Sequence, residues 1–216
     1  MEDLAPPTTR PDVWLEYLKV TATAAPHATL MTALDNFEKD GFPAGMAVDL
    51  GCGQGRDTKE LLRRQWTVLA IDSSQTALDE LKKNIDAEFR DAEIERINER
   101  AALQTLNADF ENLRIPGTDF VNASFSIPFC RPDRFPAFWR QVLIGLRSGG
   151  RFAGHFFGPN DEWVLRGSWT HFSRPRLLNV FYGFEMELFY EDERNFPTSE
   201  GIDKHWHIFH VVAKKL

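Results

Sequence analysis

A glycine-rich turn between a short apolar run and a helical stretch limits the fold of this chain more than any other feature. The run MAVDL at 46–50 predicts a buried strand, and it leads directly into the turn GCGQG. The glycines at 51, 53 and 55 let the backbone turn sharply and approach a ligand closely. Open α/β sheets bind their ligands at such turns, beyond the carboxyl ends of the strands. The segment therefore predicts a strand, a ligand-binding turn and a helix in succession.

The succession of strand and helix repeats along the chain. Asp57 and Thr58 are candidates to cap the first helix, and Asp133 to cap a later one that the glycines at 149 and 150 would stop. Short loops between alternating strands and helices predict a doubly wound, mostly parallel sheet with helices on both faces. The further strands are expected at 67–72, 103–108, 120–124 and 151–157, and the helices at 59–64, at 75–101 with a break within 86–100, and at 133–147.

The two ends of the chain complete this α/β fold. Residues 12–40 predict two helical pieces separated near Pro26, which would form a cap on the sheet. After a short helix at 174–180, two strands enclose a polar loop and should pair as an antiparallel hairpin. These strands, at 182–190 and 205–213, bring the expected number to seven. We expect a single domain over 1–216, with a helical cap at 1–44 and an α/β core at 45–216.

Composition and charge limit the classes of binding partner that this chain can have. The chain has 216 residues, with 25 Lys and Arg against 32 Asp and Glu, and this net charge of −7 disfavours binding to nucleic acid or to an anionic membrane. No run of 18 apolar residues and no signal-peptide pattern occurs, and Cys52 and Cys130 form no CxxC or zinc spacing. We expect a cytoplasmic protein, monomeric or homodimeric, with a small-molecule partner.

Acidic residues lie at the ends of the first three strands of the predicted sheet: Asp49 before the first glycine, Asp72 at the end of the second strand and Asp109 just after the third. Asp72 ends the second strand, where a carboxylate can accept both hydrogen bonds of a ribose diol. Asp49 precedes the turn and Asp57 follows it, and both would repel a pyrophosphate but could balance a cation. The turn also lacks the lysine of a phosphate-binding loop. These residues favour a nucleoside with a positive substituent, while a dinucleotide, or a tight turn without a ligand, remain the alternatives.

These motifs resemble the class I S-adenosylmethionine-dependent methyltransferases. The resemblance spans about 45–157 and rests on DLGCGQG, on Asp72 in AIDSS, on Ala108-Asp109-Phe110 and on FVNASFSIPF. The whole chain, including its ending HWHIFHVVAKK, is also similar to the bacterial tellurite-resistance methyltransferase-like branch. Enzymes that methylate bases or glutamine commonly carry Pro-Pro-Tyr after the fourth strand, and Asn122 is not followed by it, which disfavours those acceptors.

The resemblance implies a set of cofactor-binding residues. Asp49 and the glycines would line the methionine part, Asp72 would hold the ribose hydroxyls, and Asp109 with Phe110 would meet the adenine. The stretch 122–125 would run beside the transferring methyl group. The full set is Asp49, Gly51, Cys52, Gly53, Gly55, Arg56, Asp57, Asp72, Ser73, Ser74, Ala108, Asp109, Phe110, Asn122, Ala123 and Phe125.

The methyl acceptor is expected to be a small thiol, oxyanion or other metabolite, held over the ends of the fourth and fifth strands. The residues expected to contact it are Phe129, His155, Arg166 and Tyr17. His155 and Tyr17 are also candidates for a general base, should the acceptor have a proton to lose. Two alternatives are a catalytically silent module that binds S-adenosylmethionine and a nucleotide-dependent oxidoreductase.

The histidines near the C-terminus suggest a metal site at first sight. His205 and His207 share one face of the last predicted strand, but His210 lies on the other, and the sequence shows no nearby acid or cysteine that would complete a ligand set. We therefore expect these histidines to be structural and no metal to be bound. Cys52 and Cys130 are expected to be packing residues, because methyl transfer needs no thiol nucleophile.

Overall fold

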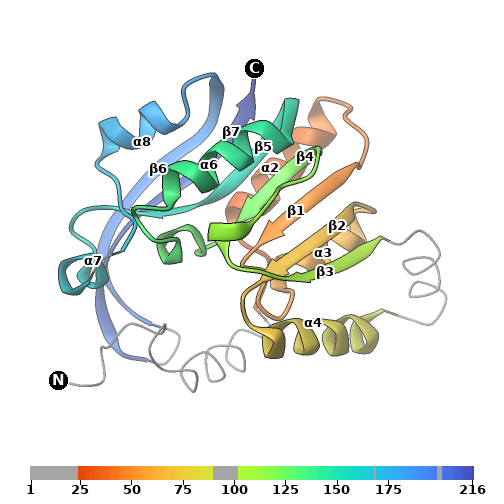
Figure 1. Ribbon diagram of the computed structural model, residues 1–216, viewed down its shortest axis with the longest axis horizontal. Helices are drawn as coiled ribbons and strands as arrows, with labels where there is room; N and C mark the ends of the chain where they lie inside the picture. Colours follow the sequence, from red (N-terminus) through yellow and green to blue (C-terminus); the bar gives the residue numbers. More distant parts are fainter. Residues whose placement is uncertain (1–23, 90–101, 168, 199–200) are drawn as a thin grey trace.

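A computed structural model describes residues 24–89, 102–167, 169–198 and 201–216. Its centre is a seven-stranded sheet in the order β3-β2-β1-β4-β5-β7-β6 (Figure 1). Strands β1 to β5 pair in parallel, and β7 pairs antiparallel with both β5 and β6. The strands are β1 (Met46–Leu50), β2 (Thr67–Asp72), β3 (Leu103–Asn107), β4 (Thr118–Ala123), β5 (Leu146–Phe157), β6 (Phe184–Pro197) and β7 (Asp203–Lys215). The predicted doubly wound sheet with a C-terminal hairpin is confirmed.

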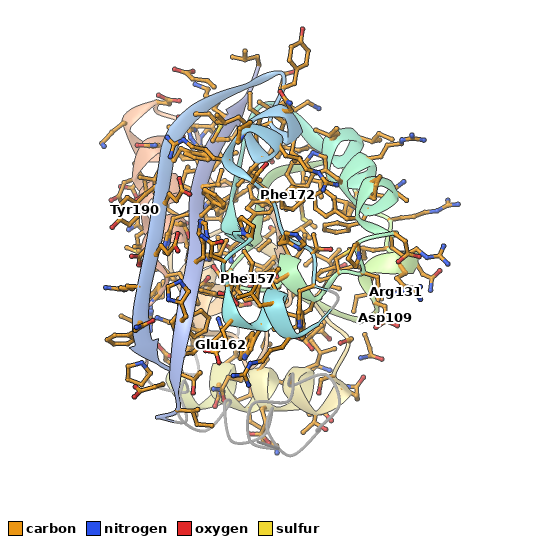
Figure 2. All side chains as sticks on the ribbon, turned by 90° about the vertical axis from the view of Figure 1, so that its left-hand side faces the viewer. Asp109, Arg131, Phe157, Glu162, Phe172 and Tyr190 are labelled. Carbon is orange, nitrogen blue, oxygen red and sulfur yellow. The ribbon has the colours of Figure 1, made fainter. Side chains whose placement is uncertain are left out.

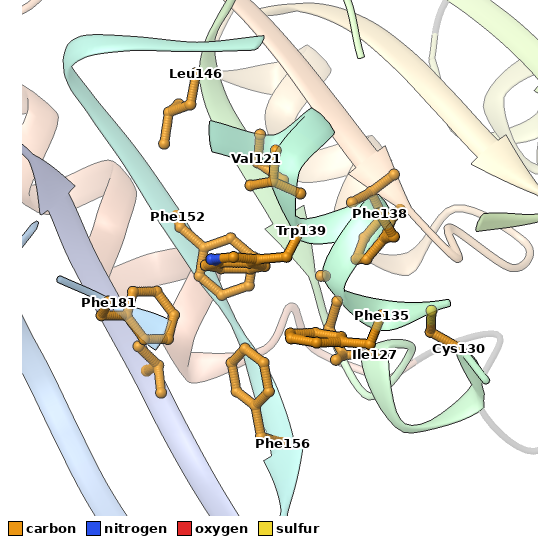
Figure 3. Packing of buried hydrophobic residues seen from close by; sticks show 14 of the residues in the cluster. Val121, Ile127, Cys130, Phe135, Phe138, Trp139, Leu146, Phe152, Phe156 and Phe181 are labelled. Carbon is orange, nitrogen blue, oxygen red and sulfur yellow. The ribbon is translucent and has the colours of Figure 1, made fainter. Parts of the chain in front are cut away.

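Helices cover both faces of the sheet. The helices are α2 (Ala28–Lys39), α3 (Arg56–Arg63), α4 (Gln75–Glu88), α6 (Phe135–Gly145), α7 (Glu162–Arg166) and α8 (Arg174–Val180). On one face, apolar residues of α2, α3 and α4 pack on the sheet, among them Leu34, Leu61 and Leu81. On the other face, α6 and α8 cover an aromatic cluster in which the Trp139 ring lies among Phe135, Phe152 and Phe156 (Figure 3). Among the described residues, no helix is both long and apolar enough to cross a membrane.

The N-terminal cap was predicted as two helical pieces. Its second piece is α2, which buries Leu30, Leu34 and Phe37 as their helical spacing predicts. Most of the first piece, including Tyr17, lies outside the described residues. The boundaries of the cap and core therefore stay a prediction.

Several predicted boundaries are wrong. The helix expected to run to Arg147 ends at Gly145, and the next residue, Leu146, is extended. A side chain at position 145 would collide with Ile115 and the Pro116 carbonyl. The chain then enters β5 at Leu146, five residues before the expected start, with a shift in its pairing to β4. Both strands of the hairpin are longer than expected, since their alternating polar residues suit a sheet with an exposed face.

The hairpin extends past the end of β5, and side chains occupy the strand edge that this leaves open. Pairing between β5 and β7 stops at Phe157 and Ile208. Beyond that point the Asp161 carboxylate accepts the main-chain N–H of His207, and Glu162 accepts that of His205. The carboxylates therefore take the hydrogen bonds that another strand would otherwise accept.

A buried arginine joins α2 to the sheet. Arg151 of β5 is 1% exposed and donates two hydrogen bonds of 2.7 Å to Glu187 and one of 2.7 Å to Asp40. Its guanidinium also lies 4.5 Å from the centre of the Phe37 ring. Removing one partner of such a buried pair leaves the other charge without compensation.

We expect Arg151→Ala to lower the free energy of unfolding by about 3 kcal/mol, because Glu187 would lose its buried counter-charge. Urea denaturation measures this. The matched control is Arg147→Ala, since the Arg147 side chain is 55% exposed where it pairs with Asp119. That variant should change the free energy by less than about 1 kcal/mol. Equal effects of the two substitutions would contradict this account.

Candidate functional site

The glycine turn is held against the second strand. The N–H groups of Gly51 and Cys52 both donate to the carbonyl of Ile71 at the end of β2. Gly51 has φ of 66°, and a Cβ atom there would lie 2.4 Å from Cβ of Ser126. Glycine is therefore required at this position both for its backbone conformation and for its close approach to the segment after β4.

Asp72 fastens the turn to the start of α4. Its two carboxylate oxygens accept the main-chain N–H of Gly53 at 2.9 Å and of Ser74 at 2.8 Å. Ser74 in turn caps α4 by accepting from the N–H of Ala77. Burial raises the pKa of Asp72, and the two backbone hydrogen bonds oppose that shift. Each oxygen accepts one N–H and keeps further acceptor capacity for a ligand hydroxyl.

The end of the third strand lies beside Asp72. The N–H of Ala108 and the side-chain amide of Asn107 both donate to the main-chain carbonyl of Asp72. Asp109 follows and is exposed at the surface, while Phe110 packs on Phe138 with ring centres 4.8 Å apart (Figure 2 labels Asp109). The residues that the resemblance assigns to the ribose and the adenine are thus neighbours.

Asp49 and Asp57 share one amide donor. The side chain of Asn122, itself fully buried, donates to Asp49 at 2.9 Å and to Asp57 at 3.0 Å. Asp49 also accepts from the Thr58 hydroxyl at 2.6 Å. Three predicted cofactor residues from β1, α3 and β4 therefore form one hydrogen-bonded group behind the turn.

Asp57 does not cap its helix as predicted. The N-cap of α3 is Gly55, in the left-handed conformation with φ of 90°. The Asp57 carboxylate instead accepts the main-chain N–H of His27 at 2.9 Å and lies 3.0 Å from its Nδ1. Burial disfavours the charge on Asp57, but the hydrogen bonds from His27 outweigh it and hold the pKa of Asp57 well below its usual value.

His27 is a site residue that the sequence analysis missed. Its Nε2 lies 2.9 Å from the Arg56 guanidinium, which has no lone pair to offer, so Nε2 accepts and Nδ1 carries the proton toward Asp57. Arg56 also donates to the carbonyl of Ala25 at 2.5 Å. No local pattern in the sequence marks His27, because its partner Asp57 lies 30 positions away.

At the end of β4, an aromatic stack forms the side of the site away from Asp72. Phe125 has φ of 53°, a conformation uncommon for a residue other than glycine. Its ring stacks on His155 at 4.0 Å, and the His27 ring lies 5.4 Å from it. The neighbouring Ala123 is fully buried in the core.

The structure does not favour His155 as a general base. Its side chain is 2% exposed, and burial lowers its pKa well below the usual value, so the ring is neutral. The N–H of Phe125 donates to its Nδ1 at 3.3 Å, which leaves the proton on Nε2. In this arrangement His155 presents a hydrogen-bond donor, and Tyr17, the other candidate base, lies outside the described residues.

A second aromatic group lies past the end of β5. Phe129 makes an edge contact with Trp169, and Trp163 contacts both Trp169 and Phe157, which Figure 2 labels near α7. The predicted acceptor residue Phe129 thus belongs to a continuous cluster of aromatic rings. Arg166 is 44% exposed and pairs with Glu162 on the same helix at 2.5 Å.

The C-terminal histidines have polar partners on the hairpin. His205 bonds to Asn195, and His207 lies 3.0 Å from Glu191. These acids lie near the histidines because residues distant in sequence pair across the hairpin. Even so, the described part of the chain contains no group of three or more side chains arranged to hold a metal ion. Both cysteines are buried, and burial raises the pKa of Cys130 to about 12, as suits packing residues.

Comparisons with known proteins agree with this geometry. Residues 47–150 match the family model of a methyltransferase domain. Carboxy-S-adenosyl-L-methionine synthase of Shewanella woodyi is 25% identical over 112 residues, which are 50% of this chain and 42% of that protein. The chain therefore spans less than half the length of that curated relative.

Solved structures show the same fold. TehB from Haemophilus influenzae has a TM-score of 0.67 at 17% identity, over 93% of this chain and 66% of that one. Magnesium protoporphyrin IX methyltransferase from Synechocystis PCC 6803, solved with S-adenosylhomocysteine bound, has a TM-score of 0.67 at 13% identity, over 95% and 94%. With the glycine turn and its acids in place, residues 47–150 form a methyltransferase domain of the class I, S-adenosylmethionine-dependent family.

Proposed function

We propose that this protein transfers the methyl group of S-adenosylmethionine to a small-molecule acceptor. The observation that carries the proposal is the position of Asp72, whose carboxylate is fixed by Gly53 of the turn and by Ser74 at the start of α4. A carboxylate fixed at the second strand end suits a ribose diol. The family match over 47–150 supports the same cofactor.

The residues present fit this cofactor. Gly51, where a side chain would collide with Ser126, lets the turn pack closely on the segment after β4. Asp49 is bonded to neutral donors only, so a cation near it would be favoured and a pyrophosphate would be repelled. When bound, S-adenosylmethionine supplies an already activated methyl group, and the protein has to orient the acceptor toward it and exclude water.

The aromatic surfaces support a small, partly apolar acceptor. Phe125 and His155 stack at the end of β4, and Phe129, Trp163 and Trp169 form a second aromatic group near α7. Such surfaces suit a compact ligand with few charges. We propose a thiol, an oxyanion or a similar small metabolite as the acceptor, with His155 as a donor that orients it.

Two other functions make different predictions. A nucleotide-dependent oxidoreductase would have to place a pyrophosphate beside the buried acids Asp49 and Asp57, which is unfavourable. A silent binding module would hold the nucleoside without turnover. Incubation with methyl-labelled S-adenosylmethionine and a panel of small thiols, phenols and soft oxyanions separates these functions. Tighter binding of NAD than of S-adenosylhomocysteine, or no labelled product from any acceptor in the panel, would count against our proposal.

The ribose contact can be tested by substitution. We expect Asp72→Ala to weaken binding of S-adenosylhomocysteine by about 10-fold or more, because charge-assisted hydrogen bonds would be lost. Calorimetric titration measures the affinity. The control is Asp86→Ala, which removes an exposed carboxylate on α4 outside the predicted cofactor residues and should leave the affinity unchanged. An unchanged affinity in a folded Asp72→Ala variant would mean that the ribose lies elsewhere.

The acceptor surface can be tested with two further variants. Phe129→Ala and Arg166→Ala should each lower methyl transfer while leaving cofactor affinity within about 3-fold, if both side chains contact the acceptor. Tyr182→Ala serves as the control, because Tyr182 is 91% exposed on the turn after α8. If Phe129→Ala loses thermal stability but keeps full transfer per folded molecule, Phe129 is a packing residue and our assignment is wrong.

We expect methyl transfer to need no metal ion. Activity should survive exhaustive dialysis against a chelator, and elemental analysis should find no stoichiometric metal. A bound metal that is lost together with activity in His205→Ala would refute this expectation. His171→Ala, at an exposed histidine with its Nδ1 on the Trp169 carbonyl, provides the matched control.

A further inference from the structure

The two buried carboxylates behind the glycine turn are stabilised by different kinds of donor. Asp57 accepts from both the main chain and the ring of His27. Asp49 accepts only from neutral side chains, the hydroxyl of Thr58 and the amide of Asn122. The exposure of Asp49 is 2% and that of Asp57 is 4%, so solvent screens neither. A negative charge is thus better stabilised on Asp57 than on Asp49.

The other groups that face Asp49 do not supply a positive charge. Asp57 on α3 and Asp72 on β2 both disfavour its ionisation. The thiol of Cys52 in the turn is neutral, because burial raises its pKa. Arg56 bonds to His27, and the main-chain N–H and the ring of His27 bond to Asp57. Burial first, and then the charge of Asp57, raise the pKa of Asp49 to about 7.

We propose that the cofactor binds with release of a proton from Asp49, and that His27 sets the pH of this release by keeping the negative charge on Asp57. Only the O–H bond of the Asp49 carboxyl group breaks, and the proton passes to the buffer. The driving force is the positive charge of the ammonium group, which S-adenosylmethionine and S-adenosylhomocysteine both carry and which favours the fully ionised pair. The inference depends on cofactor binding and not on the acceptor.

The direction of the pH dependence follows from this proton. The midpoint is the pH at which half of the free protein has Asp49 protonated. Below it, cofactor binding must remove this proton, so the affinity for the cofactor falls as the pH is lowered. Above the midpoint Asp49 is already ionised, and affinity no longer depends on its proton. For one linked proton, the dissociation constant rises by at most about 10-fold for each pH unit below the midpoint.

Calorimetry of the unmodified protein tests the proposal directly. S-adenosylmethionine and S-adenosylhomocysteine are titrated between pH 6 and 7.5 in buffers of different ionisation enthalpy, and the dependence of the binding heat on the buffer gives the number of protons released. We expect about 0.5 proton at pH 7, increasing toward one at pH 6. A binding heat that does not depend on the buffer would overturn the proposal, whereas a failure to methylate any acceptor would leave this result unaffected.

Substitutions identify the source of the proton. Asp49→Asn should abolish the release. The matched control Asp72→Asn should weaken binding and retain the release, with its midpoint at lower pH because Asp72 disfavours the ionisation of Asp49. His27→Gln should move the midpoint to higher pH. Without the His27 ring, a negative charge on Asp57 is less well stabilised, so the Asp49–Asp57 pair loses its last proton less readily. Normal release in Asp49→Asn would refute the assignment, and an unchanged midpoint in His27→Gln would refute the role of His27.

A measurement on the unmodified protein guards against variants that fail to fold. Infrared difference spectra at pH 6 should show the carbonyl band of a protonated carboxyl group disappear when S-adenosylhomocysteine is added. Persistence of that band in the complex would contradict the release of a proton from Asp49. The unmodified protein at pH 8 is the reference, because little of the protonated form remains there.

Discussion

The side-chain amide of Asn122 holds together the part of the fold on which the site depends. Strands β1 and β4 pair in parallel with Asp49 opposite Asn122, and this pairing lies at the point where the strand order reverses. One amide hydrogen then reaches Asp49 and the other reaches Asp57 on α3. Because both carboxylates are buried, loss of this donor would remove one hydrogen bond from each of them where no water can replace it. One buried side chain thus bonds to the acid before the glycine turn and to the acid after it.

The sequence predicts the sheet and the position of Asp72 well, because these depend on local signals. Alternating apolar segments and turn glycines specify strand and helix order, and a strand-end acid is recognised by its place after an apolar run. His27 lacks such a signal, since its role arises from contact with Asp57, 30 positions away. The helix cap at Asp57 is wrong for the same reason: the residue has a local capping preference, but a distant partner satisfies its carboxylate instead.

The acceptor side of the site is harder to predict than the cofactor side. The sequence marks Phe129 as an acceptor candidate, but does not show that its ring meets Trp169 edge to face. Trp206 joins this group through Trp163, because the hairpin extends beyond β5. The aromatic residues have no characteristic spacing in the sequence, whereas the turn glycines and the strand-end acids do. The proposed cofactor residues can therefore be recognised from sequence motifs and strand register. The proposed acceptor residues are brought together only by tertiary packing.

The carboxylates at the open edge of β7 have a consequence for solubility. A long hairpin that outruns its neighbour would normally expose unpaired N–H groups, and such an edge is a template on which another chain can add a strand. Here Asp161 and Glu162 occupy the donors of His207 and His205. Asp161 is in turn held by Lys204, 2.7 Å away and fully buried with it, so the protecting carboxylate cannot swing aside without leaving a buried ammonium group unpaired. The same ion pair that orders the loop after β5 thus protects this edge from intermolecular β-pairing.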